Sequence, residues 1–478
     1  MEAYNNIMRC DKYKEFCGVI GIYGHSEAAE MAYLGLYALQ HRGQEGAGIV
    51  SSDGEKVYYH RGQGLVNDVF STPETIKKLK GRIAIGHNRY STTGADAKIN
   101  IQPILVNTKN GPLALGHNGN LVNGRVLRET LQDEGALFQT TTDSEIIVHL
   151  IARSKGTDPV SQIKEALNEV RGAYSLIILT RNKLIAARDP NGFRPLALGS
   201  FSGGSVIASE TCAMDLIGAD YIRDVRPGEI LVIDERGLYS DSLTQKSHRT
   251  HCIFEFVYFS RPDSRIFGEY VDKTRRKLGE RLSEEHPAEA DIVIAVPDSS
   301  NTAALGYANH SDIRFELGLI RNHYIGRTFI EPQQTIRDIH VKVKFNPVGS
   351  VLKGKRVVVV EDSIVRGTTL KTLIQMLRKA GAKEIHVRVS SPPIQHPCYY
   401  GMDFPIQKEI IAAAMSVEDI KKHLEVDSLD YLSLEGLLSA VPREGRGYCT
   451  ACFDGKYPIP VEKTLSKDQY DRPFQEVM

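Results

Sequence analysis

The sequence predicts an α/β protein of two domains, the second of them built on a doubly wound parallel sheet. A chain of 478 residues is too long for one ordinary domain and long enough for two with substantial cores. Four consecutive valines, Val357 to Val360, predict a strand that is buried on both faces, as in a parallel sheet. A glycine-containing turn and a helical pattern that ends at Gly381 follow the strand, and this succession indicates the doubly wound sheet.

The charge balance and the lengths of the apolar runs indicate which kinds of binding partner the protein is expected to lack. Lys+Arg and Asp+Glu both total 59, so nothing indicates a general nucleic-acid or membrane surface. No apolar run approaches membrane-spanning length, and the N-terminal residues lack the apolar core of a secretory signal. We therefore expect a cytoplasmic protein without nucleic-acid or membrane partners.

Two carboxylates stand at the carboxyl end of the valine strand, where ligands bind in open α/β sheets. Glu361 and Asp362 suit ribose hydroxyls or a hydrated Mg²⁺, and the hydroxyl-rich turn Ser363–Thr369 suits a phosphate. The turn is not a Walker loop, because the lysine and its spacing are absent. The competing interpretation is an ordinary strand-to-helix turn with two surface acids.

The whole string KRVVVVEDSIVRGTT (355–369) closely resembles the phosphoribosyl pyrophosphate (PRPP) motif of type I phosphoribosyltransferases. The resemblance implies that Glu361 and Asp362 hold the ribose hydroxyls and that the turn holds the 5′-phosphate. The turn residues that it implies in PRPP binding are Ser363, Arg366, Gly367, Thr368 and Thr369.

At the other end of the chain, residues 1–16 are polar with little pattern and are predicted to be a removable leader, a propeptide. CGVIGIYG (17–24) predicts a buried first strand that begins on a cysteine. Cleavage before Cys17 would join its thiol, of pKa about 8.5, to a free α-amine of pKa about 7.7–8.0 that can take the thiol proton. The alternative is a small buried cysteine at the head of a core strand.

Polar and glycine-rich segments follow. Leu39–Ile49 combines polar residues and glycines where no ordinary helix or strand would be expected to tolerate them. Arg89 is expected in a polar turn directly after the strand Arg82–Ile85, where its guanidinium could clamp a substrate carboxylate.

GHNGNL (116–121) is expected to follow an apolar strand as a glycine-bearing turn. The Asn118 side chain and the Gly119 N–H could there point at a developing oxyanion. Asp143, in TTDSE, could anchor a substrate ammonium. Taken singly, each of these segments is more often ordinary turn chemistry.

Together, these segments resemble the class II, N-terminal-nucleophile glutamine amidotransferases across nearly all of residues 17–240. The resemblance implies an αββα sandwich in which Cys17 attacks the glutamine amide carbon. It implies that Asn118 and Gly119 form the oxyanion hole. The glutamine-binding residues would be Arg89 and Asp143.

The pattern changes near residue 245, which divides the chain into a class II amidotransferase domain over 17–245 and a phosphoribosyltransferase domain over 246–478. Glu229–Ile233 is expected to be the last strand of the first domain, and the polar residues Ser240–Thr250 are expected to form a linker. The C-terminal part of the second domain would carry a metal-cluster site.

The predicted strand Asp291–Val296 ends in a second polar turn, PDSSN (297–301). Because neighbouring strand ends converge in a doubly wound sheet, Ser299 is expected near Glu361 and Asp362. Similarity to the phosphoribosyltransferases implies that these three residues bind Mg²⁺ and line the PRPP site. A plain helix cap is the competing interpretation of PDSSN.

Between these strand ends, Glu316–Val348 has weak periodicity and several basic residues, which predicts a lid for pyrophosphate. Arg327 and Lys344 are its expected PRPP-binding residues. A solvated loop with scattered charge is the alternative.

Seven cysteines, an odd number in a long chain without a signal peptide, argue against a disulfide scaffold. Cys449 and Cys452 form a CxxC, and with Cys252 and Cys398 they supply four ligands for Zn²⁺ or a 4Fe–4S cluster, between which spacing does not choose. The surroundings resemble the iron–sulfur branch of the glutamine PRPP amidotransferases, which implies the 4Fe–4S cluster.

Over almost its whole length, the chain thus resembles the glutamine PRPP amidotransferase family, the amidophosphoribosyltransferases. The resemblance implies that glutamine is hydrolysed to ammonia, which is transferred to PRPP to give 5-phosphoribosylamine, glutamate and pyrophosphate in the first committed step of purine biosynthesis. It also implies one Mg²⁺ and one 4Fe–4S cluster in each subunit. Expected partners are purine nucleotides as feedback inhibitors and further copies of the chain in a homo-oligomer, a tetramer or a dimer.

Three other functions stay open. The same glutaminase domain occurs with sugar-isomerase or ATP-pyrophosphatase domains, which the EDSIVRGTT turn disfavours. A degenerate phosphoribosyltransferase fold can act as a purine sensor or repressor, but no DNA-binding segment is visible. The third is a structural metal protein with vestigial sites, which the intact motifs disfavour.

Overall fold

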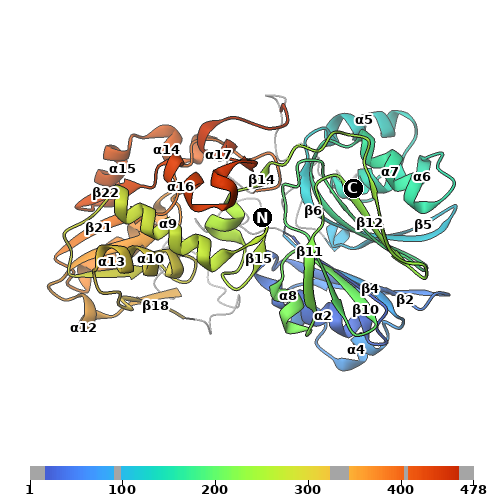
Figure 1. Cartoon of the computed structure of the whole chain (residues 1–478), viewed down its shortest axis with the longest axis horizontal. Coiled ribbons are helices and arrows are strands. Elements are labelled where there is room, and N and C mark those ends of the chain that lie inside the picture. The colour runs from blue at the N-terminus through green and yellow to red at the C-terminus, as the bar shows by residue number, and fades with distance from the viewer. Residues whose placement is uncertain (1–16, 91–97, 323–343, 403–406, 462–478) are drawn as a thin grey trace, which may run out of the picture.

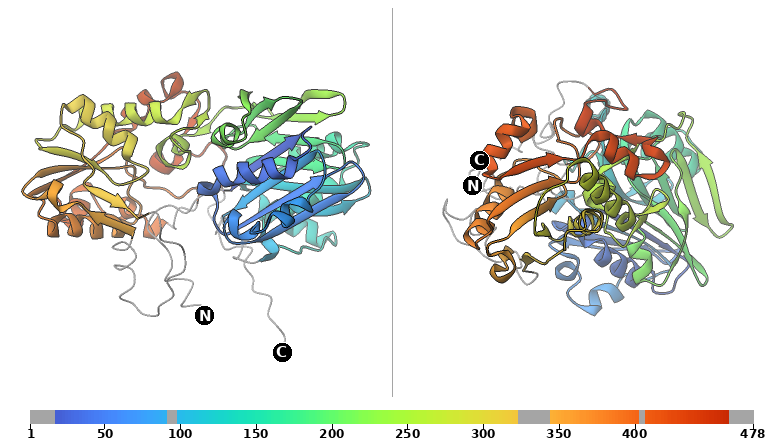
Figure 2. Two further views of the ribbon diagram at one scale, coloured as in Figure 1. Left: turned by 90° about the horizontal axis from the view of Figure 1, so that it is seen from below. Right: turned by 60° about the vertical axis from the view of Figure 1, so that its left-hand side comes forward.

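The computed structural model describes residues 17–90, 98–322, 344–402 and 407–461. These residues form two lobes that lie side by side, the first drawn in blue to green and the second in yellow to red (Figure 1). Two further views show the same arrangement (Figure 2). The predicted propeptide lies outside the described residues. Within the described part, no helix is both long and apolar enough to cross a membrane.

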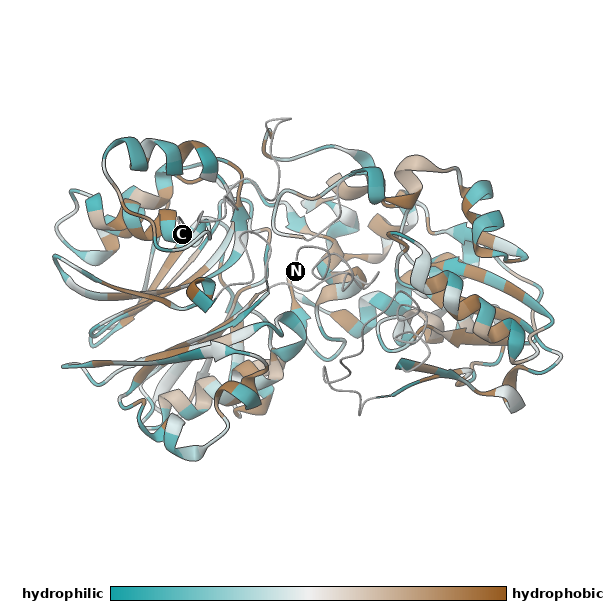
Figure 3. Cartoon of the chain, turned by 180° about the vertical axis from the view of Figure 1, so that it is seen from behind, coloured by the Kyte–Doolittle hydropathy of each residue, from teal (hydrophilic) through white to brown (hydrophobic). Residues whose placement is uncertain are grey.

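Two antiparallel sheets form the centre of the first lobe, and hydrophobic residues concentrate along their strands (Figure 3). They pack face to face, because Val19 and Ile85 of one sheet share a buried core with Ile177 and Leu184 of the other. In sheet order, the seven-stranded sheet consists of β11 (Asp220–Asp224), β9 (Ala197–Phe201), β10 (Gly204–Ala208), β1 (Gly18–Tyr23), β4 (Ile83–Arg89), β2 (Gly46–Ser52) and β3 (Val57–Gln63). The six-stranded sheet consists of β13 (Gly237–Ser242), β12 (Glu229–Asp234), β8 (Leu184–Arg188), β7 (Gly172–Thr180), β6 (Gly111–Leu121) and β5 (Ile104–Thr108).

Helices cover the outer face of each sheet with their apolar side chains. Those over the seven-stranded sheet are α2 (Ala28–Ala38), α3 (Val66–Val69), α4 (Pro73–Lys77) and α8 (Cys212–Leu216). Those over the six-stranded sheet are α5 (Gly124–Asp133), α6 (Ser144–Arg153) and α7 (Pro159–Glu169). The αββα sandwich expected for the first domain is therefore confirmed.

A four-stranded parallel sheet forms the centre of the second lobe. In sheet order, its strands are β17 (Ile292–Ala295), β20 (Arg356–Glu361), β21 (Glu384–Val389) and β22 (Ser428–Tyr431). Val358 and Val360 pack on one face, against α9 (Val271–Glu285), α10 (Asn301–Ser311) and α16 (Leu434–Ala440). Val357 and Val359 pack on the other face, against α12 (Gly349–Leu352), α13 (Thr368–Lys379) and α15 (Val417–Leu424). The doubly wound sheet, with a central strand buried on both faces, is therefore confirmed.

Short elements complete the described chain. They are η1 (Gln40–Arg42), η2 (Lys98–Asn100), β14 (His251–Cys252), the π-helical η3 (Glu255–Phe259), β15 (Arg265–Ile266), β16 (Glu269–Tyr270), β18 (Leu319–Arg321), β19 (Phe345–Pro347), η4 (Gln407–Glu409), α14 (Ile411–Ala414), η5 (Pro442–Gly445), β23 (Tyr448–Cys449) and α17 (Ala451–Asp454). β14 pairs in parallel with β23, which ties the start of the second lobe to the C-terminal region. β18 pairs with β19 at the two ends of the predicted lid, whose residues 323–343 lie outside the described part.

Two expected turns belong to strands instead. Arg89 is the last residue of β4, because this strand stays paired with β2 as far as Gly46 opposite Arg89. GHNGNL lies inside β6, which stays paired with β7 as far as Leu121 opposite Gly172. The sequence suggested turns because these strand ends carry polar residues, but tertiary partners satisfy several of them. Asn88, for example, donates to the Leu36 carbonyl oxygen at 2.7 Å.

Two other boundaries were wrong. The segment Leu39–Ile49 forms η1 and the first part of β2, where a Cβ at Gly48 would come within 2.4 Å of the Gln102 carbonyl oxygen. Glycine is therefore needed for a close approach and does not mark a loop. β12 is not the last strand of the first lobe, because β13 follows it and takes residues 240–242 from the expected linker.

A buried network of charged side chains joins the lobes. Arg42 of η1 donates to the two carboxylate oxygens of Glu255 at 3.1 and 2.9 Å and also to Glu210. Arg194 donates to Glu255 at 3.3 Å. Glu255 begins η3 in the second lobe, whereas the other three residues belong to the first lobe. Removing one partner of such a buried pair costs about 3–5 kcal/mol, so the network holds the lobes in one arrangement.

A buried histidine should make the stability of the first lobe depend on pH. Burial lowers the pKa of His87 from its ordinary value of 6.5 to about 3, against the opposing effect of its hydrogen bond with the His117 carbonyl oxygen at 3.0 Å. The unfolded chain gains a proton near pH 6.5 that the folded chain does not take up. Stability should therefore fall as the pH drops from about 6.5 towards 3, by about 1.4 kcal/mol for each pH unit.

Melting temperatures between about pH 7 and about pH 4.5 test this dependence. His87→Asn should flatten the slope, whereas His248→Asn, the same change at an exposed position, should leave the slope as in the wild type. An unchanged slope in His87→Asn would show that other groups carry the dependence.

Candidate active sites

Cys17 lies immediately before β1 and is buried in the first lobe. Its thiol donates to the Tyr90 carbonyl oxygen at 3.6 Å, and its own carbonyl oxygen accepts a hydrogen bond from Arg42 Nε at 3.5 Å. Burial raises the pKa of the Cys17 thiol to about 11, although the hydrogen bond with Tyr90 and the charge of Arg89 act in the opposite direction. The thiol is therefore protonated near neutral pH and needs a base before it can act as a nucleophile.

Arg89 and Asp143 lie close enough to Cys17 for their charges to act on its thiol, Arg89 lowering its pKa and Asp143 raising it. Arg89 reaches this place because β4 pairs with β1 in the register that sets Gly18 opposite Asn88. Asp143 occupies the N-cap position of α6, and its Oδ2 accepts the Leu121 N–H at 2.9 Å. Glu45 acts on the thiol in the same direction as Asp143. Opposite charges beside one thiol can bind the carboxylate and the ammonium of an amino acid.

The Asn118 side chain is fully buried in β6, and neither its Oδ1 nor its Nδ2 has a hydrogen-bond partner among the described residues. Buried amides normally find partners, so an unpartnered one indicates a site for a ligand. The bond between His87 and the His117 carbonyl oxygen holds this part of β6 against β4, the strand that ends at Arg89.

Gly119, the next residue of β6, has a φ of +154°. A Cβ at this position would lie 1.9 Å from the Ala173 carbonyl oxygen, so no other residue fits without a shift of the backbone. The buried, unpartnered amide and the glycine that cannot be replaced are thus consecutive residues of β6.

Sequence reasoning missed the three buried charges behind Cys17: Arg42, Glu210 and Glu255. Burial alone would raise the pKa of Glu255, but the charges of Arg42 and Arg194 hold it below its ordinary value. Glu210 also accepts the Ser264 hydroxyl at 2.7 Å, so it binds both lobes. The sequence feature that could have indicated a buried charge is a charged residue inside an apolar run, as in IFEFV (253–257).

The second candidate site lies at the carboxyl end of the parallel sheet. Ser299, which follows β17, donates its hydroxyl to Asp362 Oδ2 at 2.5 Å, and Asp362 follows the neighbouring strand β20. The convergence expected from the sheet topology is therefore confirmed. Glu361 and Asp362 are both buried, and with Ser299 they offer the oxygen ligands that suit a hydrated Mg²⁺.

The turn after these acids leads into α13. Gly367 takes a φ of +80° at the N-cap position, so Thr368 begins a 12-residue helix whose N-terminus favours an anion. Ser363 donates its hydroxyl to Asp362 Oδ1. The guanidinium of Arg366 donates to Glu409 at 3.0 and 2.5 Å, a partner that the sequence did not indicate.

Of the two residues expected in the lid, the structure describes one. Lys344 lies directly before β19, with its Nζ 5.8 Å from the centre of the Phe345 ring. Arg327 lies outside the described residues. The structure adds Arg321, which donates to Asp298 at 2.7 Å beside the turn that carries Ser299.

The four cysteines predicted to bind a cluster interact with one another, and none forms a disulfide. The pairing of β14 with β23 sets Cys252 opposite Cys449. Burial raises the pKa of Cys452, and the charges of the other three thiols raise it further. Three of these thiols are buried and Cys398 is half-buried, and thiolates are ligands that soft metals prefer. Among the described residues, however, no three His, Cys, Asp or Glu side chains are grouped closely enough to hold a metal ion as they stand.

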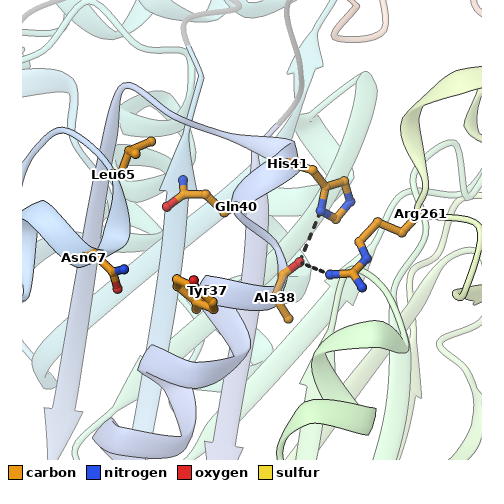
Figure 4. A pocket seen from close by; sticks show the side chains of 7 residues that line it. All are labelled: Tyr37, Ala38, Gln40, His41, Leu65, Asn67 and Arg261. Carbon is orange, nitrogen blue, oxygen red and sulfur yellow. Dashed lines mark hydrogen bonds between the residues drawn. The ribbon is translucent and has the colours of Figure 1, made fainter. Parts of the chain in front are cut away.

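A pocket of about 380 Å³ lies beside η1 (Figure 4). Its wall includes the Ala38 carbonyl oxygen, which is hydrogen-bonded to His41 Nδ1 at 3.2 Å and to Arg261 Nη1 at 3.3 Å. The lining residues are Tyr37, Ala38, Gln40, His41, Leu65, Asn67 and Arg261. Of the predicted site residues that the structure describes, none lines this pocket, but His41 and Arg261 both bond to Glu210 of the network behind Cys17.

Residues 87–215 match the glutamine amidotransferase domain family, and residues 268–403 match the phosphoribosyl transferase domain family. Amidophosphoribosyltransferase from Bacillus subtilis (strain 168) is 50% identical over 452 residues, which cover 94% of this chain and 95% of that protein. Chloroplastic amidophosphoribosyltransferase 1 from Arabidopsis thaliana is 51% identical over 467 residues, which cover 97% of this chain and 82% of that protein.

Solved structures agree with these relatives. The glutamine PRPP amidotransferase from B. subtilis, complexed with ADP and GMP, has a TM-score of 0.90 and 49% identity over 94% of this chain and 99% of that one. A structure described as the allosteric regulatory enzyme of purine biosynthesis has the same TM-score and identity, over 94% of this chain and 97% of its own. The chain therefore belongs to the amidophosphoribosyltransferases, the enzymes of the first step of purine biosynthesis.

Proposed function

We propose that Cys17 of this chain releases ammonia from glutamine and that the ammonia reacts with PRPP at the edge formed by Glu361 and Asp362. The products are 5-phosphoribosylamine, glutamate and pyrophosphate. The observation that carries the proposal is the unpartnered amide of Asn118, buried against the strand that ends at Arg89. A buried amide without a partner suits an oxyanion that forms only during the reaction. We propose that residues 17–245 form the domain that hydrolyses glutamine and that residues 246–478 form the domain that transfers the phosphoribosyl group.

In the first half-reaction, Cys17 Sγ attacks the amide carbon, and Asn118 Nδ2 and the Gly119 N–H stabilise the oxyanion. The C–N bond then breaks, ammonia leaves, and water hydrolyses the thioester to glutamate. Because burial raises the thiol pKa to about 11, a base must accept its proton. We assign this role to the α-amine of Cys17, set free when residues 1–16 are removed, and it passes the proton to the leaving ammonia. The residues that hold glutamine are Arg89 and Asp143.

In the second half-reaction, Glu361 and Asp362 hold the ribose hydroxyls of PRPP, and the turn Ser363–Thr369 holds its 5′-phosphate. The ammonia nitrogen attacks C1 of the ribose, the bond to the pyrophosphate oxygen breaks, and the nitrogen loses a proton. Glu409 orients Arg366 for the phosphate through the pair described above.

Mg²⁺ supplies positive charge next to the pyrophosphate. Its proposed ligands are Ser299, Glu361 and Asp362. A Mg²⁺ there would keep several waters and take one or two carboxylates, as is usual for this ion. Lys344 and Arg327 would neutralise the leaving pyrophosphate.

We propose that Cys252, Cys398, Cys449 and Cys452 bind one structural 4Fe–4S cluster. A single Zn²⁺ draws its sulfurs together through bonds of about 2.3 Å, whereas a cluster of four irons holds its thiolates farther apart. What supports the proposal is that the four thiols act on one another electrostatically and that β14 and β23 set Cys252 opposite Cys449. Ligation would close a very long loop of chain between the first and last of these cysteines.

The regulatory part of the proposal comes from a relative. Because the B. subtilis enzyme is complexed with ADP and GMP, we propose that purine nucleotides bind and inhibit this chain as well. A homotetramer or homodimer and a cytoplasmic location complete the proposal.

Cys17→Ala should lower glutamine-dependent synthesis by at least about 10³-fold, because no other group replaces the nucleophile. Ammonia-dependent synthesis should stay within about twofold, since it needs only the second lobe. Phosphoribosylamine formation with glutamine or with ammonium chloride measures both. Cys212→Ala removes another buried thiol outside both sites and should retain both activities.

The same preparation tests the propeptide. The intact mass of glutamine-active protein should correspond to a chain that begins at Cys17. Full activity with glutamine in a chain that retains residues 1–16 would exclude the α-amine as the base.

Asp362→Asn keeps the size of the side chain but removes its charge, and it should lower synthesis with either nitrogen source by about 10²-fold or more. The neighbouring strand offers a control, Asp291→Asn, at the opposite end of the sheet, where Asp291 bonds to Arg356. This variant should be as active as the wild type. Substantial ammonia-dependent synthesis in Asp362→Asn would mean that the ribose binds elsewhere.

Protein purified without oxygen should be brown and contain about four irons per chain. Cys452→Ser should lose the iron and melt at a lower temperature, whereas Cys212→Ser should retain both properties. Elemental analysis and visible absorbance measure the difference. If the wild-type protein were colourless and contained zinc, the four cysteines would bind zinc and the proposed cluster would be wrong.

A further inference from the structure

A turn of the second lobe lies directly against the backbone that the proposed function assigns to the oxyanion hole. A Cβ at Gly401 would come within 3.0 Å of the Gly119 carbonyl carbon and 3.2 Å of its carbonyl oxygen. One residue further along β6, Asn120 Nδ2 donates to the Tyr399 carbonyl oxygen at 2.9 Å. Gly401 itself has a φ of +99°, so the turn presents bare main chain to Gly119.

This turn is held firmly from both lobes. The ring of Tyr400 stacks on Phe193 with centroids 4.4 Å apart and an interplanar angle of 17°. The Tyr400 carbonyl oxygen accepts from Arg194 at 2.8 Å, and its hydroxyl donates to the Ile459 carbonyl oxygen at 2.7 Å. Tyr400, Phe193 and Arg194 are all buried, so the turn has little freedom to move away from β6.

Gly119 is therefore enclosed on two sides. The Ala173 carbonyl oxygen of β7 closes one side, where a Cβ would lie 1.9 Å away, and Gly401 closes the other. A glycine has wide backbone freedom, so the orientation of its peptide groups depends on the pairing of β6 with β7 and on these close neighbours. An oxyanion-hole donor acts well only when its direction is fixed before the charge develops.

We propose that Gly401 is a positioning residue for glutamine hydrolysis: the second lobe packs on the Cα and carbonyl group of Gly119 and so limits the rotation of the residue whose N–H faces the oxyanion. The inference rests on the proposed function, which places the oxyanion at Asn118 and Gly119. Its consequence is that the first lobe reaches full glutaminase activity only with the second lobe in place. Ammonia would then be released only where the second site is present to consume it.

Gly401→Ala is the test, because the added methyl group would press on Gly119. The matched control is Gly268→Ala in the same lobe, where φ is +90° and nothing lies within 4 Å of the added Cβ. Both substitutions place an alanine at a positive φ and strain the backbone in the same way, but only the methyl group of Gly401→Ala contacts β6. In full-length mature enzyme, Gly401→Ala should lower kcat for glutamine by about 10²-fold with little change in KM, and ammonia-dependent synthesis should persist. Gly268→Ala should match the wild type.

A second measurement distinguishes a loss of oxyanion stabilisation from a general folding defect. Inactivation by 6-diazo-5-oxo-norleucine, a diazoketone analogue of glutamine, requires a polarised carbonyl, whereas alkylation of Cys17 by iodoacetamide does not. Gly401→Ala should slow the first by about 10²-fold and leave the second within about twofold. Asn120→Ala, a milder change, should lower kcat for glutamine by about three- to tenfold.

Equal kinetics in Gly401→Ala and Gly268→Ala would overturn the inference. So would an equal loss of glutamine- and ammonia-dependent synthesis, or an equal slowing of both reagents, because each would indicate a general defect. Failure of the proposed function looks different: wild-type enzyme would then release no glutamate from glutamine, or Cys17→Ala would have no effect.

Discussion

The buried pair of Arg42 and Glu255 is the constraint on which the rest of the structure depends. Burial of a charged side chain is tolerated only when an opposite charge and hydrogen bonds compensate for its lost hydration. A bidentate contact between a guanidinium and a carboxylate also restricts the relative orientation of the two groups. Arg42 also donates to the Cys17 carbonyl oxygen, so the same side chain holds the start of β1. On the other side, Arg275 donates to the carbonyl oxygen of Phe256, the residue after Glu255. One ion pair thus fixes where the nucleophile stands relative to the second lobe.

This fixed arrangement is what the proposed chemistry requires. In neutral water ammonia is mostly ammonium, which has no lone pair for attack, so the two half-reactions need a protected passage between them. Lobes that rocked freely would release ammonia to solvent. The charged network behind Cys17 and the stacked pair of Phe193 and Tyr400 both join the lobes, and Arg194 links them because it donates to Glu255 and to the Tyr400 carbonyl oxygen.

Local sequence patterns predicted much of this molecule because they reflect local physics. Four valines in a row predicted a strand buried on both faces, and Val357 to Val360 alternate between two helical layers. Parallel topology then predicted that Ser299 would meet Asp362. The pattern failed at Arg89 and at GHNGNL, where polar residues suggested turns. Both segments are strands, because pairing with β2 and β7 continues through them.

The sequence by itself determined the doubly wound sheet and the strand-end site at Glu361 and Asp362, because these follow from hydrophobic periodicity and from residues that lie close together in the chain. The αββα sandwich and the residues of the first site followed from the resemblance of several motifs to a known family. Only the tertiary structure decided which distant groups meet. Glu255 meets Arg42, Glu409 meets Arg366, and Gly401 meets Gly119. The reason is physical: such contacts form where separate elements pack, and their geometry depends on how the two lobes dock.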